Sequence, residues 1–222
     1  MSISNVLDGS PRGVPMRFTP PAQLQKINLD EAPELRLQRT YREAARVLPD
    51  ADPGELAHLA LMQEVSVARL MSEGAVYAAH CVARSEAEPT VLCTAEYAIV
   101  IKESDLPATQ PLAKIANGLK EPGEPRATAV VAYPAGEAVV VGEEVSITPS
   151  ALPSGRPNGE SYSMRQAQVI MPLPDRQRLA IMSVSSTHLR DWPHFVRMLN
   201  DIAHSVRFSA SDSSGINNRL NV

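Results

Sequence analysis

Histidine is the side chain that most often performs acid–base and metal chemistry near neutral pH, and this chain has five. They are His58, His80, His188, His194 and His204. None of the spacings between them matches a metal-binding pattern such as H-E-x-x-H, so the sequence predicts no metal site. His188 precedes Asp191 by three residues and could form an acid–base dyad with it. The same pair is typical of a surface histidine beside a helix cap, and we adopt that interpretation.

The sequence contains no G-x-S-x-G, Walker-type or dinucleotide-binding motif. Gly155 and Gly159 lie in a stretch rich in helix breakers, so they do not predict a phosphate-binding loop. Ser154 in the same stretch is interpreted as a solvated turn residue and not as a nucleophile. The sequence therefore predicts that the protein is not an enzyme and uses no cofactor.

The chain has two cysteines, too few for a disulfide scaffold in a protein of 222 residues. If the hairpin around them is centred on Ala87, Cys81 and Cys93 face each other on adjacent strands. Such a pair could be a redox switch or two small hydrophobic residues of the core. We adopt the second interpretation because Arg84 is the one nearby residue that could lower a thiol pKa.

A few residues are candidates for contact with a protein partner. Trp192 is the single tryptophan; its ring could anchor a partner or cover the edge of the core. Residues 149–160 are rich in proline and glycine and predict a long loop suited to recognition. Arginines around the last expected hairpin and in this loop could contact an acidic partner or form a solvated face. These arginines are Arg165, Arg176, Arg178 and Arg156.

Composition excludes several classes of protein. The net charge is -4 and 21% of the residues are charged, which argues against a basic nucleic-acid-binding surface. No apolar run approaches the roughly 18 residues of a membrane span, and no secretory signal is evident, so a cytoplasmic location is expected. Nineteen prolines, few aromatic residues and an excess of arginine over lysine are typical of a GC-rich, actinobacterial genome.

Four helices are expected. Residues 34–48 have apolar positions at helical spacing, and a second helix begins at Asp52 and Pro53 and runs to about Ser72, before Gly74. A short helix is expected over 111–119 and an amphipathic one over 192–206. The inner face of the second helix is expected to contain Leu56, Leu59, Ala60, Val67, Leu70 and Met71.

Strands are expected at 16–19 and then in three hairpins. The hairpin strands cover residues 75–84, 90–102, 126–133, 137–147, 162–171 and 178–186. Consecutive hairpins predict an antiparallel sheet, and strands that are apolar on both faces predict helices on both sides. The expected fold is α+β, an α/β/α sandwich around an antiparallel sheet of about six strands. It forms a single domain over 15–208, between flexible tails at 1–14 and 209–222.

The last segments of the chain carry a family resemblance. These are residues 165–173 (RQAQVIMPL), 178–187 (RLAIMSVSST) and 191–208 (DWPHFVRMLNDIAHSVRF). Together with the order of the earlier elements, this ending resembles the PsbP-like sandwich, which includes Mog-type Ran-release factors and actinobacterial LpqN-like proteins. LpqN-like proteins are usually exported lipoproteins, whereas no lipid-attachment cysteine is evident before this domain. The resemblance implies a scaffold that mostly binds proteins, and it brings no catalytic residues.

The sequence therefore predicts a non-catalytic protein-interaction module. It would serve as an adaptor or assembly factor of a bacterial multi-protein machine, such as a secretion apparatus, with no nucleic-acid partner; its oligomeric state is left open. The alternative is a small-molecule-binding protein with an apolar pocket between sheet and helices, which Tyr77, His80 or Tyr97 would face. An enzyme would need His188, Asp191 or Ser154 to converge with another polar group.

Overall fold

The computed structural model describes residues 16–85, 88, 91–104, 112–120, 126–147 and 162–208. The tails and the loop expected at 149–160, with Ser154, Arg156 and both loop glycines, lie outside the described residues. The helices are α1 (Pro33–Val47), α2 (Pro53–Ser72), α3 (Leu112–Gly118) and α4 (Trp192–Ser205). The strands are β1 (Met16–Arg17), β2 (Leu24–Lys26), β3 (Ala75–Arg84), β4 (Leu92–Glu103), β5 (Arg126–Tyr133), β6 (Gly136–Ile147), β7 (Tyr162–Pro172), β8 (Arg178–Ser186) and β9 (Arg207–Phe208).

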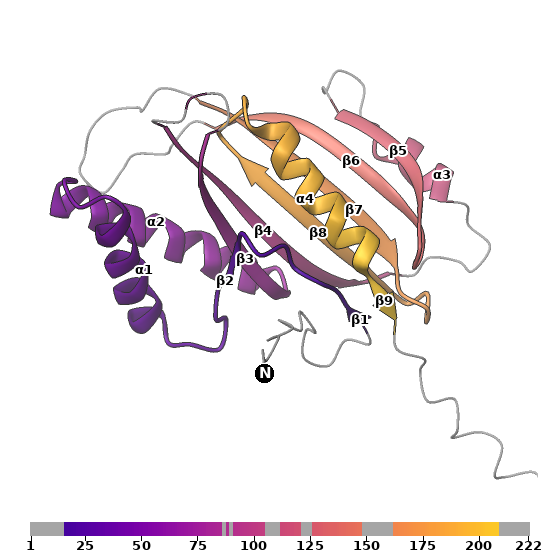
Figure 1. The fold of residues 1–222 in the computed structure, drawn as a ribbon. Coiled ribbons are helices and arrows are strands. Elements are labelled where there is room, and N and C mark those ends of the chain that lie inside the picture. The colour runs from indigo at the N-terminus through magenta and orange to yellow at the C-terminus, as the bar shows by residue number, and fades with distance from the viewer. Residues whose placement is uncertain are drawn as a thin grey trace, which may run out of the picture.

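The fold is α+β, and its main sheet is antiparallel throughout. This sheet has seven strands in the order β2-β3-β4-β8-β7-β6-β5, where about six were expected. The additional strand is β2, three residues that pair with β3 at the edge of the sheet. A strand this short shows no alternation that sequence reasoning could detect. β1 pairs with β9 and joins the two ends of the described chain (Figure 1).

The main core lies between α4 and one face of the sheet. Phe195 and Leu199 of α4 are buried against Tyr97, Met182 and Val184 of the central strands. Figure 1 shows α4 lying along this face, in front of β7 and β8. In β8 every second residue is buried, and Ala180, Met182 and Val184 among them belong to the main core beneath α4.

Two smaller clusters form on the opposite face, near its two edges. At one edge Val67 of α2 packs on Ala78 of β3. At the other edge α3 packs on Val139 and Val141 of β6. α4 therefore lies on one face of the sheet, and α2 and α3 lie on the other (Figure 1).

The predicted start and end of α2 are confirmed. Asp52 accepts a hydrogen bond from the Gly54 N–H at 2.7 Å, and Gly74 after the helix has a φ of +88°. The predicted inner face is partly wrong, because Leu59 and Met71 are exposed. α2 rests on the edge region of the sheet, so only a narrow strip of the helix is covered, centred on Leu56, Ala60 and Val67.

The two cysteines do not face each other across the hairpin. Cys81 lies opposite Ala95 and Cys93 lies opposite Ala83, because the hairpin is centred on residue 88 and not on 87. Both side chains are unoxidised thiols and are buried in the main core. Burial, together with the neighbouring Cys93, raises the pKa of the Cys81 thiol, which makes that thiol less reactive.

Candidate interaction surface

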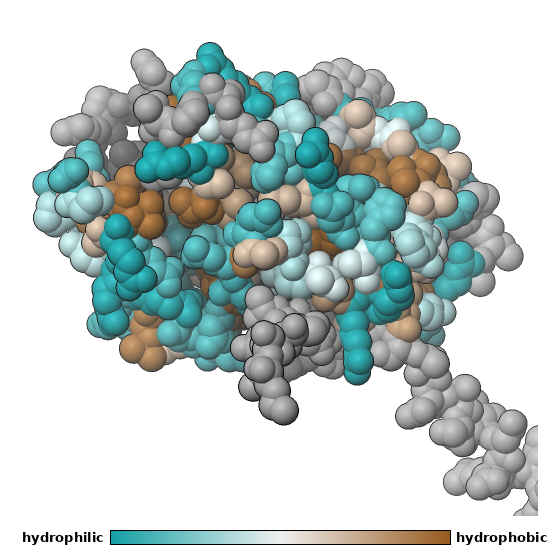
Figure 2. Space-filling view, in the orientation of Figure 1, coloured by the Kyte–Doolittle hydropathy of each residue, from teal (hydrophilic) through white to brown (hydrophobic). Residues whose placement is uncertain are grey.

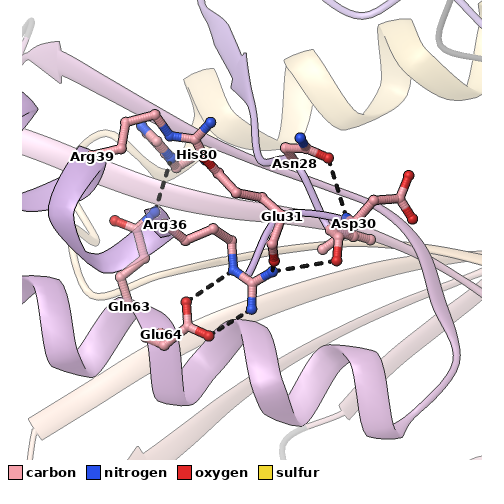
Figure 3. A network of polar contacts seen from close by, with 9 residues as sticks. Asn28, Asp30, Glu31, Arg36, Arg39, Gln63, Glu64 and His80 are labelled. Atoms are coloured by element: carbon pink, nitrogen blue, oxygen red, sulfur yellow. Dashed lines mark hydrogen bonds and ion pairs between the residues drawn. The ribbon is translucent and has the colours of Figure 1, made fainter. Parts of the chain in front are cut away.

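A buried ion pair holds α1 and α2 together as a hairpin. Arg36 of α1 is 4% exposed, and its Nε and Nη2 donate to the two carboxylate oxygens of Glu64 on α2, at 3.0 and 2.6 Å (Figure 3). Its Nη1 donates to the backbone carbonyls of Leu29 and Glu31. The hydrogen bond with Glu64 is the main reason that the pKa of Arg36 is raised. A two-point pair of this kind fixes both distance and orientation between the helices.

A second group of polar contacts attaches α2 to the sheet. The Nδ1 of His80 on β3 lies 3.4 Å from the side-chain amide of Gln63 on α2 (Figure 3). Its Nε2 lies 3.0 Å from the side-chain oxygen of Gln25 on β2. Ser66 of α2 donates to the Glu96 carboxylate of β4 at 2.9 Å. α2 is therefore bound through polar side chains to β3 and β4, and His80 extends this network to β2.

Because these polar residues of α2 face inward, apolar residues of the same helix face outward. Gln63, Glu64 and Ser66 face α1 or the sheet, whereas Leu61, Met62 and Val65 are 43, 48 and 56% exposed. We call Leu61, Met62 and Val65 the α2 apolar face. A helix that is hydrophobic on all sides is normally covered on all sides. Here the side away from the sheet has no cover among the described residues.

Exposed hydrophobic side chains are concentrated on this hairpin. Of eleven large hydrophobic residues exposed in the described part of the chain, seven belong to α1 and α2. The seven are Leu35, Val47, Leu59, Leu61, Met62, Val65 and Met71. Figure 2 shows a few hydrophobic residues among hydrophilic ones over α1 and α2, at the left of the molecule, and another hydrophobic group at the right, on the side of β5 and β6. A concentration of this kind is typical of a protein-binding surface.

The structure separates the arginines proposed as an interaction patch. The Nε and Nη2 of Arg178 donate to the Oδ2 of Asp175 in the β7–β8 turn, at 2.8 and 2.7 Å. Arg176 lies in the same turn with a φ of +55°. Arg165 lies at the far end of β7, opposite Ser186, where it pairs with Glu144 at 3.0 Å. Seven residues of strand, about 23 Å, separate it from the turn, so these three arginines do not form one patch. Arg156 lies outside the described residues.

The remaining candidate residues do not converge either. Trp192 is half-buried and packs against the main core, which is the position expected of a residue covering the core edge. The His188 Nδ1 accepts from the Thr94 N–H at 3.2 Å. The Asp191 carboxylate instead accepts from the Ser85 hydroxyl at 3.1 Å. His188 thus bonds to β4, whereas Asp191 bonds to the residue that follows β3.

The proposed ligand-facing residues lie on opposite faces of the sheet. Tyr77 and Tyr97 are buried in the main core, whereas His80 faces α2. The Tyr97 hydroxyl donates to the Phe195 carbonyl at 3.0 Å, so α4 packs directly onto the strand at this point. A hollow of about 300 Å³ does exist between α3 and the β7–β8 turn, lined in part by Leu112, Glu137 and Arg176. This hollow is open and lies away from α4.

The fold and this surface define an α+β protein whose one evident specialisation, in its described part, is an uncovered apolar helix face. Comparison with protein-family models, with curated proteins and with solved structures gave no match. No helix among the described residues has the length and hydrophobicity to cross a membrane. Sequence reasoning missed the α2 apolar face, although one signal was present: Leu61, Met62 and Val65 fall outside the inner face expected for this helix.

Proposed function

We propose that the protein is a non-catalytic protein-interaction module that binds its partner through the α2 apolar face. The observation that carries this proposal is the exposure of Leu61, Met62 and Val65 on a helix whose polar residues face inward. We also propose that the fold is a PsbP-like α/β/α sandwich, with α4 as one outer layer and α2 and α3 as the other.

The partner that fits this face is an amphipathic helix of another protein. Leu61 and Val65 are four residues apart and form a ridge of the kind that packs into the groove of a second helix. Covering the three half-exposed side chains contributes about 1 kcal/mol each. The rigid attachment of α2 to α1 and to the sheet means that the face is already formed before binding.

An adaptor or assembly factor of a bacterial multi-protein machine uses such a surface, and a secretion apparatus is one candidate. We place this role in the cytoplasm. Both cysteines are buried as thiols, which is compatible with a reducing compartment.

Affinity capture followed by reconstitution tests the proposal. Val65→Glu puts a charge on the α2 apolar face while keeping a good helix former there. Val145→Glu, at a β6 position that is 37% exposed, is the matched control. We expect the wild type and the control to capture the same partner, and the purified partner to bind the Val65→Glu protein about tenfold or more weakly. The proposal is overturned if the wild type has no stable partner, or if Val65→Glu binds as the wild type does.

A further inference from the structure

The strand β5 is an edge of the main sheet, with no further strand beside it among the described residues. The strand order places β2 at one edge and β5 at the other. β2 is only three residues long and ends in Lys26, both of which discourage further pairing. β5 has eight residues and pairs with β6 in an unbroken register from Arg126–Glu143 to Tyr133–Gly136. Among the described residues β6 is its only neighbour in the sheet, so half of its backbone N–H and C=O groups point away from the sheet.

The side chains in the middle of β5 do not prevent another strand from pairing with it. The six residues between Arg126 and Tyr133 read Ala-Thr-Ala-Val-Val-Ala and include no charge and no proline. Natural edge strands are normally protected by lysine, proline or a bulge, and an exposed flat edge without these features pairs with another strand. Ala127, Ala129, Val130 and Ala132 are all exposed. We propose that β5 pairs in antiparallel fashion with β5 of a second copy of this chain.

The two-fold arrangement is favoured by the distribution of charge. In a two-fold pair the middle of the strand meets itself, and the absence of charge there removes like-charge repulsion. Arg126 at one end meets the other end of the second copy's strand, near Ala132. The residue beside Ala132 on β6 is Glu137, which is exposed and lies on the same face as Arg126. Arg126 pairs with Glu143 of its own β6 at 2.8 Å, so each end of the joint brings this ion pair, and not a lone charge, toward Glu137 of the second copy.

This interface is independent of the proposed partner site. α2 packs on β3, next to the opposite edge of the sheet, and Figure 1 shows α2 and β5 at opposite sides of the molecule. A dimer joined through β5 has one sheet that continues through both copies, with an α2 apolar face near each end. It presents two binding faces to a partner assembly, which raises the strength of attachment without any new contact.

Sedimentation analysis of the full chain tests the inference. We expect the wild type to be a concentration-dependent dimer and Val130→Lys to raise the dimer dissociation constant about tenfold or more, because it places two lysines close to the two-fold axis. Val82→Lys is the matched control: Val82 and Val130 are both 39% exposed and point to the α2 side of the sheet, but Val82 lies on β3. The control is expected to dimerise as the wild type does, with circular dichroism confirming that all three proteins are folded.

Hydrogen exchange gives a second readout that needs no variant. The backbone amides of β5 are expected to exchange more slowly in concentrated than in dilute wild-type protein, because pairing with the second copy protects them. The inference is overturned by a wild type that stays monomeric, by Val130→Lys that dimerises as well as the wild type, or by exchange in β5 that does not depend on concentration. If Val130→Lys dimerises as well as the wild type, sedimentation of Leu61→Glu shows whether the α2 apolar face forms the dimer instead.

Discussion

The guanidinium of Arg36 and the carboxylate of Glu64 form a two-point ion pair that joins α1 to α2 beneath the surface of the protein. The side chains are 5 and 14% exposed. Burial of this degree removes both charges from most of the water that would otherwise stabilise them, so each charge depends on the other. The pair also sets which side of α2 faces inward, and thereby which side presents Leu61 and Val65 to a partner.

Removal of Arg36 is expected to be strongly destabilising. Arg36→Ala leaves the Glu64 carboxylate buried without its partner and removes the donor to the Leu29 and Glu31 carbonyls. The free energy of unfolding in urea should fall by about 3–5 kcal/mol. Arg69→Ala is the control, because Arg69 pairs with Glu73 at 3.0 Å on the exposed surface of α2, and its loss should cost about 0.5 kcal/mol or less. Equal losses in the two variants would contradict the assignment.

Two buried tyrosines are expected to respond differently to loss of the hydroxyl. The Tyr97 hydroxyl donates to the Phe195 carbonyl, so Tyr97→Phe should lower the free energy of unfolding by about 1 kcal/mol. The buried Tyr77 hydroxyl has no hydrogen-bond partner in the described structure, and burial raises the pKa of Tyr77 to about 12. Tyr77→Phe should therefore be neutral or stabilising. Thermal unfolding of the two variants measures the difference, and an equal loss of stability in both would refute it.

The half-buried imidazole of His80 is expected to make stability depend on pH. Burial lowers the pKa of His80; Glu43 opposes this shift and Arg39 adds to it. The unfolded chain, with a histidine pKa of about 6.5, then binds the proton more readily than the folded protein. The free energy of unfolding should thus fall as the pH drops through about 6.5 toward the lower pKa of the folded state.

The variant His80→Gln isolates this effect from that of the carboxylates. Glutamine keeps hydrogen-bonding groups near Gln63 and Gln25 but cannot take up a proton. Urea unfolding between about pH 7 and pH 5 should show a steeper loss of stability for the wild type than for His80→Gln. Parallel pH profiles would mean that His80 takes up its proton equally in both states.

The two thiols are expected to be unreactive until the protein unfolds. Cys81 and Cys93 are buried and lie diagonally, each opposite an alanine, and the Cys93 thiol donates to the Ala83 carbonyl at 3.4 Å. A thiol reagent should titrate both groups in denaturant but react slowly with the native protein. A mild oxidant should not link them. Formation of an intramolecular disulfide in the folded protein would support the redox switch instead.

Local signals in the sequence were sufficient to predict most helices and strands of the fold. The cap at Asp52, the proline at position 53 and the glycine at position 74 give the bounds of α2 because they act on the backbone of their own segment. The β7 and β8 hairpin follows from alternation and a turn between them. β2 was missed because its three residues depend on β3 for their conformation.

The sequence alone did not predict which residues of neighbouring strands lie opposite each other. A shift of the β3–β4 hairpin by one residue in its centre was enough to separate Cys81 from Cys93, and no local residue fixes that centre. The same limit applies to the arginines: Arg165 and Arg178 are close in sequence, yet the length of a strand separates them.

The sequence by itself determined that this chain forms an antiparallel sheet with amphipathic helices and that its expected elements supply no known catalytic motif. Only the tertiary structure decided which side of α2 is covered. Helical periodicity alone could not predict which side of α2 is covered, because this helix has apolar residues on both sides. The choice comes from contacts that are distant in sequence, namely Arg36 with Glu64 and Ser66 with Glu96. Burying these polar groups requires their partners, so they fix the rotation of α2 and leave Leu61, Met62 and Val65 facing solvent.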